Sequence, residues 1–175
     1  MKIVFLDRDG TFIQDPLDER VDREDKIELF PDTIDALKYL AENDFAVVVV
    51  TNQAGISEGR INKDDFHRIH RKVLEMLEPS GVKILKTFMC PHDSNDGCDC
   101  RKPKPKMLLE ALDEFGAIPE HTYYVGDNVS DIEAGINAGM KTVLVETARN
   151  KKVVAPRATY SAPSLLDAVQ YIVSH

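Results

Sequence analysis

Short apolar runs alternate with amphipathic segments along the chain, and this alternation restricts the fold more than any other feature. The apolar runs occupy residues 3–6, 45–50, 84–88, 123–125 and 142–145. Helical patterns with one apolar face separate them, at about residues 33–40, 62–77, 104–115, 128–138 and 164–172. Strands that are apolar on both faces and joined by helices form parallel sheets with helices on each side. The sequence therefore predicts the α/β class, with a doubly wound parallel sheet.

Two segments lack a clear period and are expected to be loops. Residues 10–30 are polar and acid-rich, which predicts a long surface loop after the first strand. Residues 146–163, with Lys151, Lys152 and Pro156, are also typical of a loop. Neither segment is long enough for a separate cap domain.

The helix expected at residues 62–77 carries its apolar side chains on one face. Asn62 begins it with a residue type that suits an N-cap. His67 and His70 fall on the other side of the helix, and we expect both to be solvated.

Length and charge limit the classes of function. A chain of 175 residues with 43% hydrophobic content can bury one core, so we expect a single domain over residues 1–175. The formal net charge of -8 disfavours a nucleic-acid or membrane-surface partner, because phosphate groups would be repelled. The first apolar run is too short for a signal peptide or a membrane span, which favours a cytoplasmic protein. Nothing in the sequence calls for an obligate protein partner.

Two carboxylates close the first strand. Asp7 and Asp9 follow the run at residues 3–6 and precede a turn at Gly10. Side chains two residues apart on an extended strand point the same way, so both carboxylates can address one substrate atom while Arg8 points elsewhere. One can attack while the other carries protons. The alternative is an Asx-rich turn without chemistry.

Other polar residues end the later strands. Thr51 follows the second strand, Asp127 follows the fourth, and Arg101 and Lys102 precede the helix at residues 104–115. Ligands of doubly wound sheets bind beyond the carboxyl ends of the strands, where these groups would converge. Carboxylates, a hydroxyl and an ammonium group suit phosphoryl transfer.

An anionic phosphate beside two carboxylates needs a cation between them. Hard oxygen ligands indicate Mg²⁺. Lys104 and Lys106 compete with Lys102 for the phosphate, and otherwise carry ordinary surface charges. The expected partner of the site is a small-molecule phosphate ester.

A second metal site is predicted from one short segment that contains every cysteine of the chain. The candidate ligands are Cys90, His92, Cys98 and Cys100. Thiolates and imidazole select zinc, and four protein ligands leave no open position for catalysis. We therefore expect a structural Zn²⁺ in a small loop, with free thiols or a disulfide as the alternative.

These motifs resemble those of the haloacid dehalogenase superfamily of aspartyl-phosphate phosphatases, over nearly the whole chain. The matching motifs are, in order, Asp7-Arg8-Asp9-Gly10-Thr11, Thr51-Asn52, Lys102, and Gly126-Asp127 with Asp131. The resemblance implies that Asp7 attacks phosphorus, and that Asp9 protonates the leaving alcohol and then activates water.

The same resemblance implies the binding residues. Thr51 and Lys102 would hold phosphate oxygens, and Asn52 and Arg101 would contact substrate or phosphate. Magnesium would be bound by Asp7, the backbone carbonyl of Asp9, and Asp127. Asp131 could serve as a helix cap or as a residue behind the metal ligands.

The cysteine segment resembles the branch that holds histidinol-phosphate phosphatase and D-glycero-D-manno-heptose 1,7-bisphosphate phosphatase. The short gap between His92 and Cys98 and the stretches 13–16 and 21–26 favour the former; residues 51–56 and 107–109 favour the latter. We expect histidinol phosphate as the substrate, with the heptose bisphosphate as the alternative. A phospho-receiver-like signalling module is the alternative of another class, although a receiver lacks the second acid.

Overall fold

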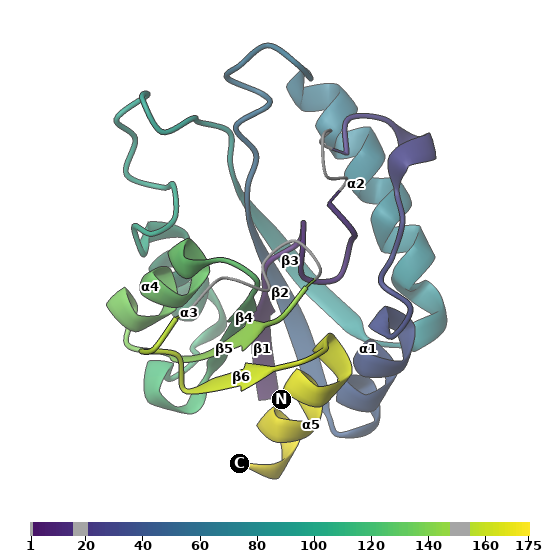
Figure 1. Cartoon of the computed structure of the whole chain (residues 1–175), viewed down its shortest axis with the longest axis vertical. Helices are drawn as coiled ribbons and strands as arrows, with labels where there is room; N and C mark the ends of the chain where they lie inside the picture. Colours follow the sequence, from purple (N-terminus) through teal and green to yellow (C-terminus); the bar gives the residue numbers. More distant parts are fainter. Residues whose placement is uncertain (1, 16–20, 148–154) are drawn as a thin grey trace.

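Six parallel strands form one sheet in the order β3-β2-β1-β4-β5-β6 (Figure 1). The structure is a computed structural model that describes residues 2–15, 21–147 and 155–175. The strands are β1 (Lys2–Leu6), β2 (Phe45–Asn52), β3 (Lys83–Cys90), β4 (Tyr123–Gly126), β5 (Lys141–Val145) and β6 (Tyr160–Ala162). The central strands are buried on both faces, as the continuous apolar runs predict.

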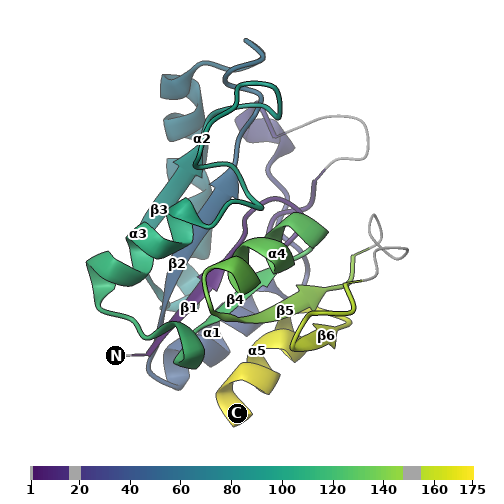
Figure 2. The ribbon, with the colours of Figure 1, turned by 90° about the vertical axis from the view of Figure 1, so that its left-hand side faces the viewer.

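Helices cover both faces of the sheet. They are α1 (Thr33–Glu42), α2 (Lys63–Leu77), α3 (Lys106–Phe115), α4 (Val129–Asn137) and α5 (Leu165–Ser174), with short 3-10 helices at Glu24–Lys26, Glu78–Ser80 and Pro119–His121. Val4 and Leu6 pack with α1, α2 and α5, whereas Phe5 packs with α3 and α4. Figure 2 shows α3 and α4 in front of the sheet and α1 behind it. The predicted doubly wound α/β fold is confirmed.

The strand register places the first carboxylate at the centre of the sheet. Leu6 pairs with Val49 of β2 and with Val125 of β4. The backbone N–H of Asp7 then donates to the Val125 carbonyl at 2.8 Å, so the pairing continues one residue beyond β1. Asp7 is held by its own backbone at the carboxyl edge of two neighbouring strands.

Two expectations about loops are wrong in part. The segment at residues 10–30 was expected at the surface, but Phe12 and Ile13 are fully buried and join the core beside α1. The stretch before Ser164 was expected to be a loop, but β6 pairs in parallel with β5 there. A strand of three residues is too short to show a period. Pro16, Lys151 and Lys152 lie outside the described residues.

The expectation that His70 is solvated is also wrong. Its side chain is buried, its ring stacks on Phe66 at 5.7 Å between centroids, and its Nε2 lies 2.7 Å from the Thr87 hydroxyl. The buried face of α2 is wider than the apolar pattern indicates, because Thr87 on β3 supplies a polar partner. His67 is exposed, as expected.

No separate cap domain covers the strand ends in the described ranges. The loops that follow β1, β2 and β3 rise on that side of the sheet instead (Figure 1). None of the helices described is long and apolar enough to cross a membrane.

Candidate active site

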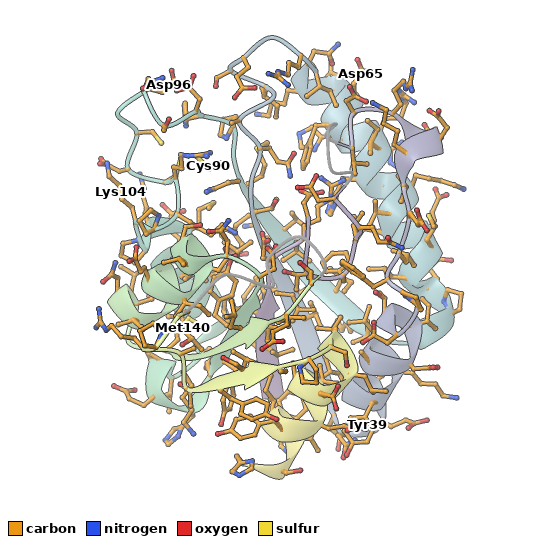
Figure 3. All side chains as sticks on the ribbon, viewed as in Figure 1. Tyr39, Asp65, Cys90, Asp96, Lys104 and Met140 are labelled. Carbon is orange, nitrogen blue, oxygen red and sulfur yellow. The ribbon has the colours of Figure 1, made fainter. Side chains whose placement is uncertain are left out.

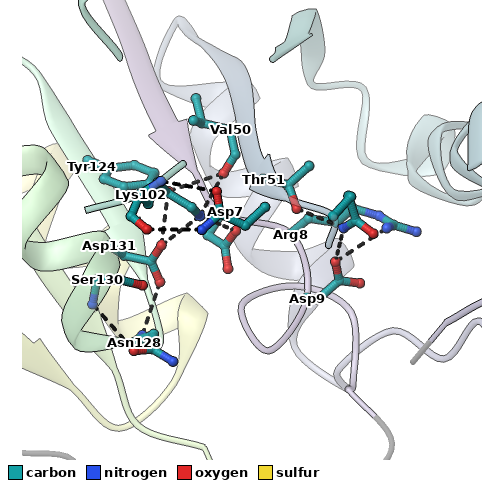
Figure 4. A network of polar contacts seen from close by, with 12 residues as sticks. Asp7, Arg8, Asp9, Val50, Thr51, Lys102, Tyr124, Asn128, Ser130 and Asp131 are labelled. Atoms are coloured by element: carbon teal, nitrogen blue, oxygen red, sulfur yellow. Dashed lines mark hydrogen bonds and ion pairs between the residues drawn. The ribbon is translucent and has the colours of Figure 1, made fainter. Parts of the chain in front are cut away.

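The polar residues that end the strands meet at the carboxyl edge of the sheet, between β1 and β4. The helix after β1 covers one face of the sheet and the helix after β4 covers the other. Such a change of direction between neighbouring strands opens a crevice for ligands in doubly wound folds. Figure 4 shows Asp7 between a group formed by Lys102, Tyr124 and Asp131 and a second group formed by Asp9, Arg8 and Thr51.

Lys102 is the centre of the first group. Its Nζ donates to Asp7 Oδ1 at 2.7 Å, to the Tyr124 hydroxyl at 2.8 Å and to the Val50 carbonyl at 3.1 Å. It also pairs with Asp131 Oδ1 at 2.6 Å, and the lysine side chain is only 3% exposed. A buried ammonium group thus links the expected nucleophile to the helix α4.

The acidic groups of this cluster repel one another. Burial, and then the charge of Asp131, raise the pKa of Asp7 well above its usual value, while Lys102 acts in the opposite direction. Burial and Asp131 also raise the pKa of Asp127, to about 7. Burial alone would lower the pKa of Lys102, but Asp131 and Asp7 outweigh burial and raise it. The single positive charge of Lys102 therefore does not balance the three carboxylates, and a bound cation would supply more.

The carboxylate oxygens of Asp7, Asp127 and Asp131 fit a hard divalent cation, since they lie within 4.8 Å of one another. Asp131 makes other contacts as well. Its Oδ1 pairs with Lys102, and its Oδ2 accepts from the Asn128 N–H at 3.1 Å within a capping box that begins α4. Asp131 thus serves as helix cap and as partner of Lys102, and Asp7 and Asp127 stay the predicted metal ligands.

Two glycines let these carboxylates approach the backbone. Gly10 has a φ of +83°, and a Cβ on it would lie 2.4 Å from Asp127 Oδ2. A Cβ on Gly126 would lie 2.4 Å from the Asp131 Cβ. Side chains at these positions would collide with the acidic cluster, which explains why each glycine adjoins an aspartate motif.

Asp9 belongs to the second group. Its Oδ2 accepts from Gln53 Nε2 at 2.5 Å and from Arg8 Nη1 at 3.3 Å, and its side chain is 23% exposed. Gln53 Nε2 also donates to the Thr51 hydroxyl at 2.9 Å. The sequence reasoning missed Gln53 and Arg8. The available signal was the position of Gln53 two residues after Thr51, which places both side chains on one side of an extended chain.

Asn52 and Arg101 contact protein groups in this structure. The Asn52 side chain accepts from the Lys102 N–H at 3.1 Å and donates to the Lys102 carbonyl at 3.3 Å. Arg101 Nη1 donates to the His92 carbonyl at 2.9 Å. Both residues therefore fix the segment that carries Lys102, and their contact with substrate stays a prediction.

The two competing lysines lie elsewhere. Lys104 Nζ contacts the Cys98 carbonyl and Asp99, in the loop that Figure 3 labels at Cys90, Asp96 and Lys104. Lys106 lies 4.0 Å from Glu110 on the exposed side of α3. Of these three lysines, Lys102 is the one that the fold places beside Asp7.

The four predicted zinc ligands come together. Cys90 Sγ lies 3.7 Å from Cys98 Sγ and 3.0 Å from Cys100 Sγ, and His92 Nδ1 lies 3.3 Å from Cys100 Sγ. No disulfide joins the three cysteines, so the disulfide alternative is not realised here. Burial raises the pKa of Cys90 to about 12, a preference for the thiol that a zinc ion would reverse. The donor set fits a closed tetrahedral zinc site.

A cavity of about 460 Å³ lies at the opposite edge of the sheet. Lys2, Phe45, Tyr123 and Lys141, which begin β1, β2, β4 and β5, are among its lining residues. None of the predicted site residues lines it, so the carboxylate site and this cavity are separate.

Comparison with known proteins agrees with the geometry. A family model of haloacid dehalogenase-like hydrolases matches residues 6–139. D-glycero-beta-D-manno-heptose-1,7-bisphosphate 7-phosphatase of Neisseria meningitidis is 34% identical over 99% of this chain and 95% of its own length. Histidine biosynthesis bifunctional protein HisB of Legionella pneumophila is 34% identical over 88% of this chain and 44% of its own length.

A solved structure extends the likeness to three dimensions. The D,D-heptose 1,7-bisphosphate phosphatase from B. bronchiseptica, crystallised with magnesium and phosphate, superposes with a TM-score of 0.92 at 31% identity, and 99% of each chain is covered. The parallel sheet with helices on both faces and the acidic groups at its carboxyl edge agree with this likeness. The chain belongs to the haloacid dehalogenase-like hydrolases and is a phosphatase of that family.

Proposed function

We propose that this phosphatase hydrolyses D-glycero-D-manno-heptose 1,7-bisphosphate at the 7-phosphate, with magnesium and through an aspartyl-phosphate intermediate. The observation that carries the proposal is the likeness to heptose bisphosphatases over 99% of the chain, in sequence and in structure. Histidinol phosphate was the first expectation from the sequence. The comparisons favour the alternative, because the match to HisB covers 88% of this chain at the same 34% identity.

Asp7 is the proposed nucleophile. It lies at the end of the central strand β1, and its Oδ1 is held by Lys102 at 2.7 Å. Attack by an Asp7 oxygen on phosphorus would form the aspartyl-phosphate and release the alcohol. Lys102 and the Thr51 hydroxyl would bind the phosphate oxygens, because both lie at the same strand edge as Asp7.

Magnesium would be held by Asp7, Asp127 and the Asp9 carbonyl. When bound, it would neutralise charge on the phosphate and on the acidic cluster. Burial, and then the charge of Asp131, raise the pKa values of Asp7 and Asp127, and a cation bound between these carboxylates would favour their ionised forms. Zinc would be held by Cys90, His92, Cys98 and Cys100 and would order the loop that leads to Lys102.

A comparison of kcat/KM tests the substrate. The α and β anomers of the heptose bisphosphate and histidinol phosphate should be measured in the same buffer with Mg²⁺, with Asp7→Asn as the inactive control. We expect kcat/KM for one heptose anomer to exceed kcat/KM for histidinol phosphate by more than about tenfold. This ratio is equivalent to about 1.4 kcal/mol in the transition state. A preference of that size for histidinol phosphate would restore the first expectation.

A further inference from the structure

Both hydrogen bonds that the structure gives to the Asp9 carboxylate go to the same oxygen. Gln53 Nε2 donates to Oδ2 at 2.5 Å, and Arg8 Nη1 donates to Oδ2 at 3.3 Å. Among the described residues no donor contacts Oδ1. An ionised carboxylate offers only acceptors, so the amide nitrogen of Gln53, and not its oxygen, must face Asp9. The two oxygens of Asp9 therefore have different surroundings.

Gln53 joins Asp9 to the expected phosphate-binding hydroxyl. Its Nε2 donates one hydrogen to Asp9 Oδ2 and the other to Thr51 Oγ1, and the distance from Nε2 to Thr51 Oγ1 is 2.9 Å. Because Thr51 accepts from Gln53, its own hydroxyl hydrogen remains available to donate to an anionic oxygen. The backbone of Gln53 is fixed as well, since its N–H donates to the Cys90 carbonyl at 2.7 Å.

Arg8 holds Asp9 from the protein interior. Its side chain is fully buried, and its guanidinium lies 5.3 Å from the centre of the Phe66 ring. Its Nε and Nη2 have no hydrogen-bond partner among the described residues. A buried cation with so few partners is costly. The Asp9 carboxylate is its hydrogen-bonded counter-ion, which ties this carboxylate to one place.

We propose that Gln53 is a positioning residue which, with Arg8, holds Asp9 by Oδ2 and leaves Oδ1 to transfer the proton. The inference rests on the proposed phosphatase function. In the first step, the Asp7 oxygen bonds to phosphorus, the bond from phosphorus to the leaving oxygen breaks, and the proton on Asp9 Oδ1 passes to that oxygen. In the second step, Oδ1 takes a proton from water, the water oxygen bonds to phosphorus, and the bond to Asp7 breaks.

Leaving-group dependence separates this role from phosphate binding. An alkyl phosphate needs a proton on its leaving oxygen, whereas p-nitrophenyl phosphate releases a stabilised anion. The parameter kcat/KM reports the steps up to the first phosphoryl transfer. For Gln53→Met we expect kcat/KM to fall about 100-fold on the heptose 1,7-bisphosphate, whose 7-phosphate is an alkyl ester, and less than about threefold on p-nitrophenyl phosphate. Thr51→Val should reduce both values alike.

A second readout follows from the second step. Because Asp9 must also activate water, Gln53→Met should release a rapid burst of p-nitrophenol, equal to the enzyme concentration, before a slow steady rate. Gln170→Met, an exposed glutamine on α5, is the control and should match the wild type. Equal loss on both esters without a burst would overturn the positioning role alone. A wild type that hydrolyses neither the heptose bisphosphate nor p-nitrophenyl phosphate would overturn the proposed function and this inference with it.

Discussion

Lys102→Met is expected to destabilise the protein as well as inactivate it, because the Lys102 ammonium lies between two buried carboxylates. Its Nζ is 2.7 Å from Asp7 Oδ1 and 2.6 Å from Asp131 Oδ1. The three side chains are no more than 9% exposed, so water cannot solvate the two carboxylates once the ammonium group is gone. Methionine keeps most of the side-chain volume and removes only the ammonium group.

The size of the effect follows from the burial of the cluster. Counted as formal charges, the three groups sum to -1 with Lys102 and to -2 without it, in the same buried space. Removing one partner of a buried ion pair typically costs about 3–5 kcal/mol, against a total stability of about 5–15 kcal/mol for a domain. Lys106→Met is the matched control, since its partner Glu110 is 4.0 Å away at the surface; we expect it to change stability by less than about 0.5 kcal/mol.

Urea unfolding in buffer without magnesium measures the change, because a bound divalent cation could replace the ammonium group. The double variant Lys102→Met with Asp131→Asn restores the charge of -1. A double-mutant cycle with both single variants should therefore give a favourable coupling of about 1–3 kcal/mol. If Lys102→Met costs less than about 1 kcal/mol, or the two changes simply add, the argument from buried charge is refuted.

Four further predictions follow from the same structure. Asp7→Asn should abolish turnover yet leave the urea midpoint equal or higher, because it removes a repelled, buried carboxylate; near-normal activity would exclude Asp7 as nucleophile. Gly10→Ala should lower kcat/KM more than about 100-fold, since its Cβ would lie 2.4 Å from Asp127 Oδ2; a functional Ala variant would show that this loop can shift. Burial, then the charge of Arg8, lowers the pKa of His70 to about 4, so the unfolded state binds more protons below pH 6.5. His70 should therefore lower the free energy of unfolding by about 2 kcal/mol as the pH falls from 7 to 5. Urea titrations at the two pH values should show that His70→Gln removes this loss. Elemental analysis of protein purified without added metal should find one zinc per chain, and absence of zinc together with no structural change on chelation would reject the site.

The sheet and the acidic centre could be predicted from the sequence because their signals are local. Continuous apolar runs mark buried strands, and the carboxyl ends of parallel strands must share an edge. Asp7, Thr51 and Asp127 were found in this way, and the spacing of the three cysteines and His92 indicated the second cluster. The strand β6 was missed because three residues cannot display a period.

Contacts between distant side chains could not be predicted. His70 is buried because Thr87, which is 17 residues away, offers a hydroxyl to it. Arg8 was expected to point away from Asp9, but its Nη1 donates to the Asp9 carboxylate at 3.3 Å. The contact of Asn52 with substrate stays a prediction, but the hydrogen bonds of its amide with the Lys102 backbone were not foreseen. Each case depends on a partner that only the folded chain supplies.

The paired hydrogen bonds between Asn52 and Lys102 have a consequence for how this enzyme class can diversify. Asn52 also pairs with Cys90 in the sheet. Both ends of the loop between Cys90 and Lys102 are therefore hydrogen-bonded or paired to the same residue of β2. A loop anchored at its base can gain or lose residues at its tip at small entropic cost. New substrates could be selected there by insertion and deletion, while the lysine that meets the nucleophile keeps its place.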